Sequence, residues 1–242
     1  MTLKKTKTKG LRVIKSVIQV ILVFLFAVIS TAILITIKKK NLMFEERIFY
    51  LVSVASEGRE TLLEPQKELL KNLGAANMVY KKNDSYHLIA SVYLEQEYAE
   101  EIKGNLTSYF PDVKILKIKS KRIGKKSIKK IRDVVGLEKL IKTLYAYTQD
   151  FQQLHMNFLA GKSSEGQFLN DMVRRKLELE KLNQQIELKN EYAEKAQGFG
   201  EFFALKMTNF LSGLDVSRSR QNYICNYFVG FYLDFIEFYN SL

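Results

Sequence analysis

The sequence predicts an α+β protein in which an N-terminal transmembrane helix precedes a small βαββαβ domain and an all-α helical bundle. Residues 17–37 form an uncharged apolar run, strand-like and helix-like segments alternate over residues 48–119, and residues 127–242 show only helical patterns without proline. The predicted parts are a basic tail (1–16), the membrane span (17–37), the mixed domain (48–119), a basic linker (120–126) and the bundle (127–242).

The apolar run has the length of a membrane-spanning helix. It contains 21 uncharged residues from Val17 to Ile37, and about 20 apolar residues suffice to cross the hydrocarbon core of a bilayer. A cleavable signal peptide would have a shorter apolar region and a small-residue cleavage site, whereas Lys38, Lys39 and Lys40 follow this run directly. The sequence therefore predicts a retained, single-pass signal anchor.

Basic residues flank the predicted span unequally. Six Lys or Arg precede it and three follow it, and residues 1–40 contain no Asp or Glu. Because basic flanks favour the cytoplasmic side, we expect the N-terminus inside. The domains after residue 40 would then lie on the extracytoplasmic side of a bacterial cytoplasmic membrane.

The net charge of +12 mostly reflects this anchor. Residues 1–40 hold nine of the 38 Lys and Arg, which leaves 29 basic against 26 acidic side chains in residues 41–242. This near-balance gives no electrostatic reason to expect a nucleic-acid partner. Cys225 is the only cysteine, which excludes an internal disulfide and a multi-cysteine metal site.

The mixed domain is predicted from alternating strand and helix patterns. The expected elements are a strand (49–55), a helix (61–73), two strands joined by a tight turn (78–80 and 86–94), a second helix (95–110) and a last strand (113–118). Pro65 lies in a first helical turn, where proline is tolerated, and Pro111 ends the second helix. This order predicts that both helices cover one face of an antiparallel sheet and leave the other face for a ligand.

Two stretches of this region resemble the repeats of a SPOR domain. Phe49–Ser56 (FYLVSVAS) resembles the first repeat, and Tyr86–Tyr93 (YHLIASVY), followed by Glu95–Glu100 (EQEYAE), resembles the second. The resemblance covers about residues 48–119. It implies binding to septal peptidoglycan, with a preference for glycan strands stripped of stem peptides. It also implies a role in cell division or sporulation.

The same resemblance implies a binding face on the sheet. Carried over by position, the tentative ligand-binding residues on the open face are Leu51, Ser53, His87, Ile89 and Ser91. Leu51 and Ile89 make this face more apolar than a sugar surface requires, so a protein partner is an alternative. An RNA-binding sheet of the same order would need stacking aromatic residues where His87, Ile89 and Ser91 stand.

A basic run joins the two predicted domains. Residues 114–132 contain ten Lys or Arg and no acid, and Gly124 marks the expected boundary. The run is either an exposed, mobile linker that continues into the next helix, or a patch for anionic wall polymers or lipid headgroups.

The C-terminal half is predicted to be helical throughout. A long amphipathic series ends at Gly161, and Ser164 with Gln167 has the pattern of a capping box. A heptad seam over residues 168–196 follows, which is one helix of an intramolecular bundle or, alternatively, a dimerising coiled coil. Gly198, Gly200 and Gly213 are expected to delimit a helix at 202–211.

The last predicted helix, residues 219–239, is aromatic around nearly its whole circumference. A helix that is apolar on all sides is normally buried. We therefore expect it at the centre of the bundle or in an oligomer interface. A protein partner or self-association is expected for the helical half.

The sequence contains no recognisable catalytic pattern. His87 and His155 lie in different predicted domains outside any metal-ligand spacing, and Cys225 has no base near it in sequence. We expect no enzyme activity, metal or cofactor. The predicted function is a membrane-anchored, non-catalytic envelope protein that binds septal or spore peptidoglycan. The alternative is a structural assembly protein whose SPOR-like and helical domains both bind protein.

Overall fold

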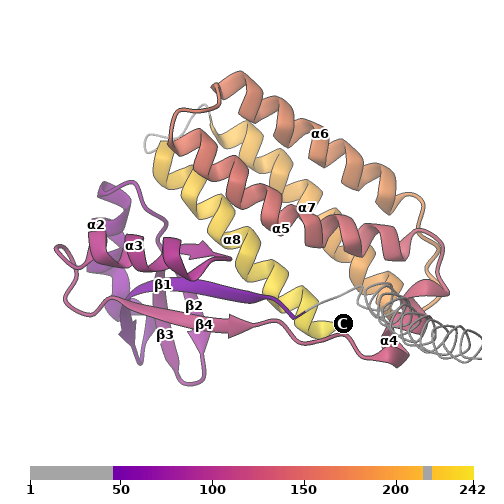
Figure 1. Ribbon diagram of the computed structural model, residues 1–242, viewed down its shortest axis with the longest axis horizontal. Helices are drawn as coiled ribbons and strands as arrows, with labels where there is room; N and C mark the ends of the chain where they lie inside the picture. The colour runs from indigo at the N-terminus through magenta and orange to yellow at the C-terminus, as the bar shows by residue number, and fades with distance from the viewer. Residues whose placement is uncertain (1–45, 215–219) are drawn as a thin grey trace, which may run out of the picture. The chain divides into compact units, whose positions relative to one another are not determined.

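A four-stranded antiparallel sheet and a layer of long helices make up the computed structural model, which describes residues 46–214 and 220–242 (Figure 1). The strands are β1 (Ile48–Glu57), β2 (Met78–Lys82), β3 (Ser85–Tyr93) and β4 (Lys114–Lys119), in the order β2-β3-β1-β4. Between them lie a short 3-10 helix η1 (Glu60–Leu63) and helices α2 (Glu64–Asn72) and α3 (Gln96–Leu106). The helical layer consists of α4 (Lys125–Arg132), α5 (Leu137–Leu159), α6 (Glu165–Asn183), α7 (Glu191–Leu214) and α8 (Arg220–Ser241).

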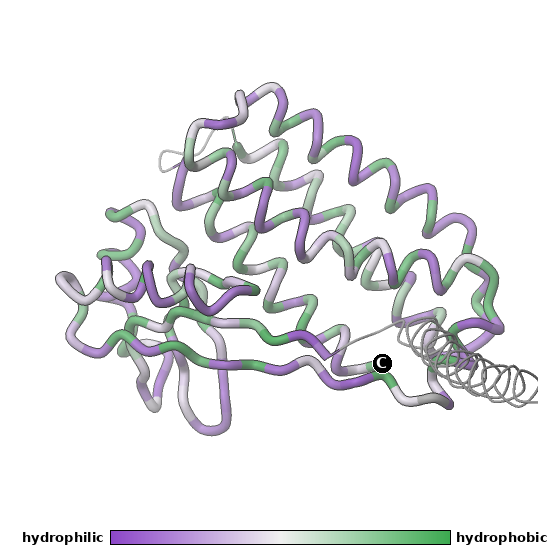
Figure 2. Tube along the Cα trace, in the orientation of Figure 1, coloured by the Kyte–Doolittle hydropathy of each residue, from purple (hydrophilic) through white to green (hydrophobic). Residues whose placement is uncertain are grey.

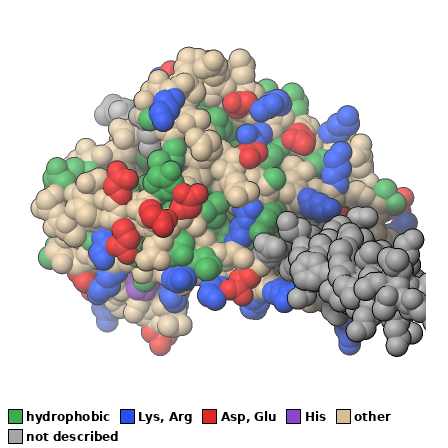
Figure 3. Space-filling model, viewed as in Figure 1, with side chains coloured by type: hydrophobic (Ala, Val, Ile, Leu, Met, Phe, Trp, Pro, Cys, Tyr) green, Lys and Arg blue, Asp and Glu red, His purple; other side chains and the backbone are tan. Residues whose placement is uncertain are grey.

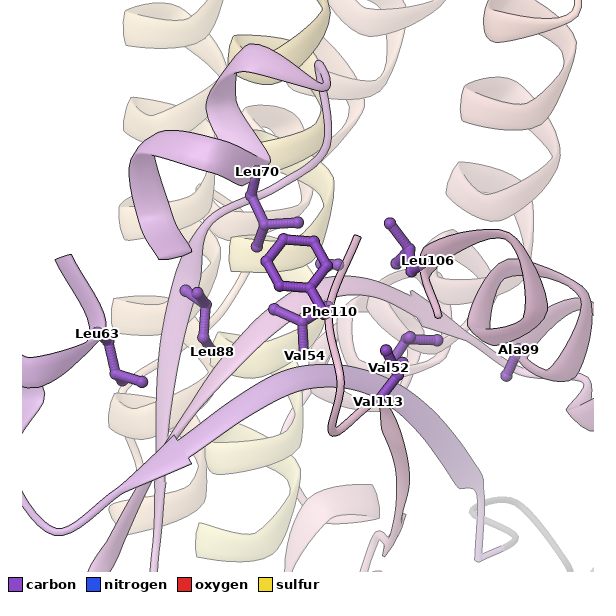
Figure 4. Close-up of a cluster of buried hydrophobic side chains, with 10 residues drawn as sticks. Val52, Val54, Leu63, Leu70, Leu88, Ala99, Leu106, Phe110 and Val113 are labelled. Carbon is purple, nitrogen blue, oxygen red and sulfur yellow. The ribbon is translucent and has the colours of Figure 1, made fainter. Parts of the chain in front are cut away.

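One face of the sheet forms a core with η1, α2 and α3. Val52, Val54 and Leu88 project from β1 and β3 into a cluster that also holds side chains from all three helical segments (Figure 4). The other members are Leu63, Leu70, Ala90, Ala99, Leu106, Phe110 and Val113. Because side chains alternate between the faces of a strand, the odd-numbered neighbours Leu51 and Ile89 lie on the opposite face.

That opposite face is covered by α8. The Phe49 ring packs against Tyr232 and Phe235, with centroid separations of 6.2 and 6.3 Å. Polar contacts add to this apolar layer, since the Asn77 backbone amide before β2 donates to the Asn226 side-chain oxygen on α8, and the Asn226 side-chain nitrogen donates to the Asn77 side-chain oxygen, each at 2.8 Å. The face predicted to be open is therefore an internal interface of the protein.

Helix α8 is the centre of the helical layer as well as the cover of the sheet. It contacts β2 and β3 on one side and α5 and α7 on the other. Phe231 is fully buried, with its ring 4.7 Å from that of Phe151 on α5 and 4.4 Å from that of Phe203 on α7. The expectation that the aromatic helix is buried is confirmed, and the burial occurs within the chain.

The heptad seam also packs within the chain. Phe168, Met172 and Leu179 of α6 are fully buried, whereas hydrophilic and hydrophobic residues alternate along this outer helix (Figure 2). The capping box is confirmed. The backbone amide of Gln167 donates to the Ser164 hydroxyl, and the side-chain oxygen of Gln167 accepts from the backbone amide of Ser164.

The expected break near Gly198 and Gly200 is wrong, since α7 runs continuously from Glu191 to Leu214. Gly200 is needed for close packing rather than for a turn. A Cβ atom at this position would overlap the side-chain amide of Asn183 on α6.

The predicted fold class requires two corrections. The helical half does not form a bundle apart from a small domain, because Glu46–Leu242 fold as one compact unit with α8 packed on the sheet. Among residues 46–214 and 220–242, no helix is long and apolar enough to cross a membrane. The predicted tail (1–16) and span (17–37) lie outside the described residues.

The predicted localisation is corrected by the same finding. A single-pass protein with extracytoplasmic domains requires a membrane-spanning helix, and the described part of the chain contains none. The predicted localisation rested on the span at 17–37 and on its basic flanks within residues 1–40, all of which lie outside the described residues.

The start of the predicted linker is hydrogen-bonded to the body of the protein, while Lys121, Arg122 and Gly124 are exposed as expected. The Ser120 backbone amide donates to the Arg47 carbonyl, and the Arg47 backbone amide donates to the Ser120 hydroxyl. The Lys121 amide donates to the Asn240 side chain at 2.6 Å. Ile123 is 5% exposed and anchors the segment before α4 begins. Hydrogen bonds and one apolar residue within the basic run together bind this segment to the body of the protein.

Candidate functional site

The five predicted ligand-binding residues do not form an open surface. Leu51 and Ile89 are fully buried beneath α8, and Ser53 is 2% exposed. The Ser53 hydroxyl donates to the carbonyl of Ala55 within a bulged part of β1. His87 is half-buried, and burial, followed by the nearby charges of Lys82 and Lys114, lowers its pKa. Ser91 alone lines a cavity.

This cavity, of about 200 Å³, occupies the junction between the sheet and the helical layer. Strand β2 begins at Met78, which pairs with Ile89, so residues 90–93 of β3 extend beyond it without a strand partner on that edge. The Ala90 carbonyl there accepts from the Ala76 amide before β2. Helices α3, α5 and α8 close the space beside this free edge. The topology of the sheet therefore creates the cavity.

The cavity walls are mainly apolar, with several uncharged polar groups among them. The apolar walls include Leu73, Ile102, Leu106, Met156, Phe228 and Val229. The polar groups are Ser91, Tyr93, Asn105, Gln152, His155, Gln221, Cys225 and Tyr232. Among the described residues, those that line the cavity include no Lys, Arg, Asp or Glu. Pockets of this composition are typical of sites for small molecules.

The most distinctive polar feature is a cysteine–histidine pair. Cys225 Sγ on α8 lies 3.4 Å from His155 Nε2 on α5, and the His155 ring stacks on Phe228 with a centroid separation of 4.6 Å. Burial raises the pKa of the Cys225 thiol to about 12 and lowers the pKa of His155 to about 4. Both groups are therefore neutral at physiological pH.

A neutral pair limits the chemistry that the site can perform. A nucleophilic cysteine needs a depressed pKa and a cationic or basic neighbour. Here burial raises the pKa of the Cys225 thiol and lowers the pKa of the His155 imidazole, so neither requirement is met. Burial likewise raises the pKa of the Tyr93 phenol to about 12. The cavity offers hydrogen bonds and apolar contact, without an ionised group poised for acid–base catalysis.

Two further polar groups have fixed roles in the cavity wall. The Gln152 side-chain carbonyl accepts from the Leu94 amide at 2.9 Å, so it satisfies the backbone where β3 ends. The Tyr232 hydroxyl donates to the Thr148 carbonyl at 2.7 Å. The buried Ser91 hydroxyl has no partner in good hydrogen-bond geometry, but it lies close enough to the Tyr93 hydroxyl to act on it as a hydrogen-bonding neighbour and to offset part of the rise that burial causes in the pKa of that phenol.

Sequence reasoning missed this site because its parts are far apart in the chain. Cys225 and His155 are 70 residues apart, so neither has the other near it in sequence. No pattern in either helix signals that α5 and α8 bring them together. Within the described residues, no group of three or more His, Cys, Asp or Glu side chains could hold a metal ion.

Comparisons with known proteins add no relative, since no family model, curated protein or solved structure matches this chain. The resemblance of residues 48–119 to SPOR domains therefore stays a prediction.

We expect acid to destabilise the protein through His155. Its pKa is about 4 in the folded state against 6.5 for an exposed histidine, so the unfolded chain takes up the proton first as the pH falls. The contribution of the neutral His155 imidazole to the free energy of unfolding is fully present above pH 6.5. It is lost as the pH falls from 6.5 to 4. The full difference corresponds to roughly 3 kcal/mol. We expect a loss of about 2 kcal/mol between pH 7 and pH 4.5, because part of the full difference appears only below pH 4.5.

Urea denaturation at pH 7 and pH 4.5 measures this loss. The His155→Phe variant should lose much less stability over the same range. His87→Asn should retain most of the loss, because burial also lowers the pKa of His87 but less strongly than that of the more deeply buried His155. An equal loss in the wild type and His155→Phe would show that other groups cause the acid sensitivity.

Proposed function

We propose that this protein is a non-enzymatic binding protein whose ligand occupies the cavity between β3, α3, α5 and α8. The observation that carries the proposal is the cavity itself, an apolar space at the free edge of β3 with uncharged polar groups on several sides. The neutral state of Cys225 and His155 favours binding over catalysis.

The size of the cavity limits the ligand. An engineered protein cavity of roughly 150 Å³ holds benzene, and sites for drug-sized molecules begin at about 300 Å³. A volume of about 200 Å³ therefore suits one ring with a short substituent or an aliphatic molecule of similar size.

The position of the cavity gives binding a structural consequence. Ser91 and Tyr93 contribute from the sheet, and His155 and Cys225 contribute from the helical layer. A ligand that contacts both sides would stabilise the packing of α8 on the sheet, because a ligand stabilises the state that binds it.

We expect toluene, a neutral probe of suitable size, to raise the melting temperature. At ten times its dissociation constant it should add about 1.4 kcal/mol, or roughly 3 to 6 °C for a chain of this length. Differential scanning fluorimetry with an extrinsic dye measures the shift. Ser91→Leu fills the cavity from its wall and should abolish the shift, whereas Ser85→Leu, at the start of the same strand but outside the cavity, should retain it. No shift in the wild type would refute the proposal.

A second candidate function is protein binding on the outer helices, which would serve an assembly role. Leu177 of α6 and Leu205 of α7 are 57% and 59% exposed. Leu205 borders a groove whose wall includes Asn183, a 4% exposed residue with neither side-chain amide atom hydrogen-bonded. A partner could cover the leucines and satisfy the amide. Cross-linking of the wild type, but not of Leu177→Asp with Leu205→Asp, to a cellular protein would support this function.

Glycan binding through the sheet stays a prediction, and the geometry does not favour it. Leu51, Ser53 and Ile89 could reach a glycan strand only if α8 left the sheet, which would expose Phe49, Tyr232 and Phe235 to water. A pull-down with denuded peptidoglycan tests it directly.

A further inference from the structure

Extending the proposed function, on which this inference rests, we infer that the ligand is an uncharged aromatic compound with a single ring and one hydrogen-bonding substituent. Three features of the cavity determine this class: its lack of charge, its aromatic walls and the unpartnered hydroxyl of Ser91.

The lack of charge excludes ions. Burying a charged ligand without a counter-charge costs far more than apolar contact returns, and no Lys, Arg, Asp or Glu is among the described residues that line the cavity. Acidic side chains gather over α3 on the face shown in Figure 3, where Glu97, Glu100 and Glu101 are all exposed. Glu101 lies near enough to Tyr93 to act on its phenol electrostatically, so an anion is disfavoured further.

The walls favour a ring over a chain. Phe228, Tyr93 and Tyr232 present aromatic surface to the cavity, and the His155 ring already stacks on Phe228. Aromatic rings gain edge-to-face or offset contacts beyond their buried area. Met156 supplies a thioether, which also makes favourable contacts with rings.

The Ser91 hydroxyl calls for a polar substituent on that ring. A buried polar group without a partner is uncommon in folded proteins. A ligand that supplies the missing hydrogen bond removes the free-energy cost of leaving this hydroxyl unsatisfied. Ser91 lines the cavity from the part of β3 that extends beyond β2, and its hydroxyl lies beside that of Tyr93, just beneath the cavity surface. A hydroxyl on the ligand can donate to this group or accept from it.

Four probes of nearly equal size separate these requirements. Benzyl alcohol is neutral and carries a hydroxyl, toluene is neutral without one, and benzoate and benzylammonium carry opposite charges. Ligand-observed NMR titrations of the full chain would give the four dissociation constants. We expect benzyl alcohol to bind about threefold to tenfold more tightly than toluene, and at least tenfold more tightly than either ion.

Two variants link the preference to Ser91. Ser91→Ala should reduce the affinity for benzyl alcohol to that for toluene while leaving the affinity for toluene unchanged, and Ser85→Ala should change neither. Equal binding of neutral and charged probes, or an unchanged preference for benzyl alcohol in Ser91→Ala, would overturn the inferred ligand class and leave the binding function standing. Failure of all four probes to bind, with Ser91→Leu behaving as the wild type, would instead refute the binding function.

Discussion

Replacing Phe231 with alanine is expected to lower the free energy of unfolding by about 4 kcal/mol, near the upper end for a buried phenylalanine. The side chain is fully buried, and its ring contacts aromatic rings on α5, α7 and α8. The cavity left behind would be surrounded by rings that cannot collapse into it without moving whole helices. Urea denaturation followed by circular dichroism measures the loss.

Phe202→Ala provides the matched control. Phe202 lies on α7 and is 46% exposed, so the same truncation should cost less than about 1 kcal/mol. A loss of similar size in both variants would mean that α8 is not the centre of the core.

Phe49→Ala is expected to cost about 3 kcal/mol, and the loss should be shared between the sheet and the helices. Phe49 is fully buried on β1, yet its aromatic neighbours Tyr232 and Phe235 belong to α8. A double-mutant cycle with Phe235→Ala should give a coupling energy of about 1 kcal/mol, the range measured for aromatic pairs in contact.

The exposed Tyr109→Ala serves as the control for this cycle, because Tyr109 is 55% exposed after α3. Its effect should add to that of Phe235→Ala without coupling. A coupling energy near zero between Phe49 and Phe235 would indicate that the sheet and the helical layer fold separately.

Local periodicity was sufficient to predict much of the sheet and its faces. The alternation along β3 separates Leu88 and Ala90, which lie in the core with α2 and α3, from His87, Ile89 and Ser91 on the other side. The capping residues Ser164 and Gln167 correctly marked the start of α6. These features depend on residues close in sequence, which is where pattern and propensity are informative.

Periodicity does not say what covers a face. The apolar character of Leu51 and Ile89 was read as a property of an exposed binding surface, whereas it reflects burial beneath a helix more than 120 residues away. Likewise, Gly200 has the same appearance in sequence whether it ends a helix or lets α6 and α7 approach closely. The Cys225–His155 pair also depends on the packing of two distant helices.

Native-state hydrogen exchange, followed by mass spectrometry, tests the central claim that the sheet and α8 share one core. Exchange of the full chain would be measured at increasing concentrations of urea, comparing amides of β1 and β3 with those of α8. Cooperative units exchange with a common opening free energy. We expect the slowest amides of β1, β3 and α8 to converge on one opening free energy. Phe49→Ala should lower that opening free energy by the same amount in all three elements. Continued protection of β1 and β3 after α8 has fully exchanged would contradict the account, because it would show that the second sheet face does not need its helical cover.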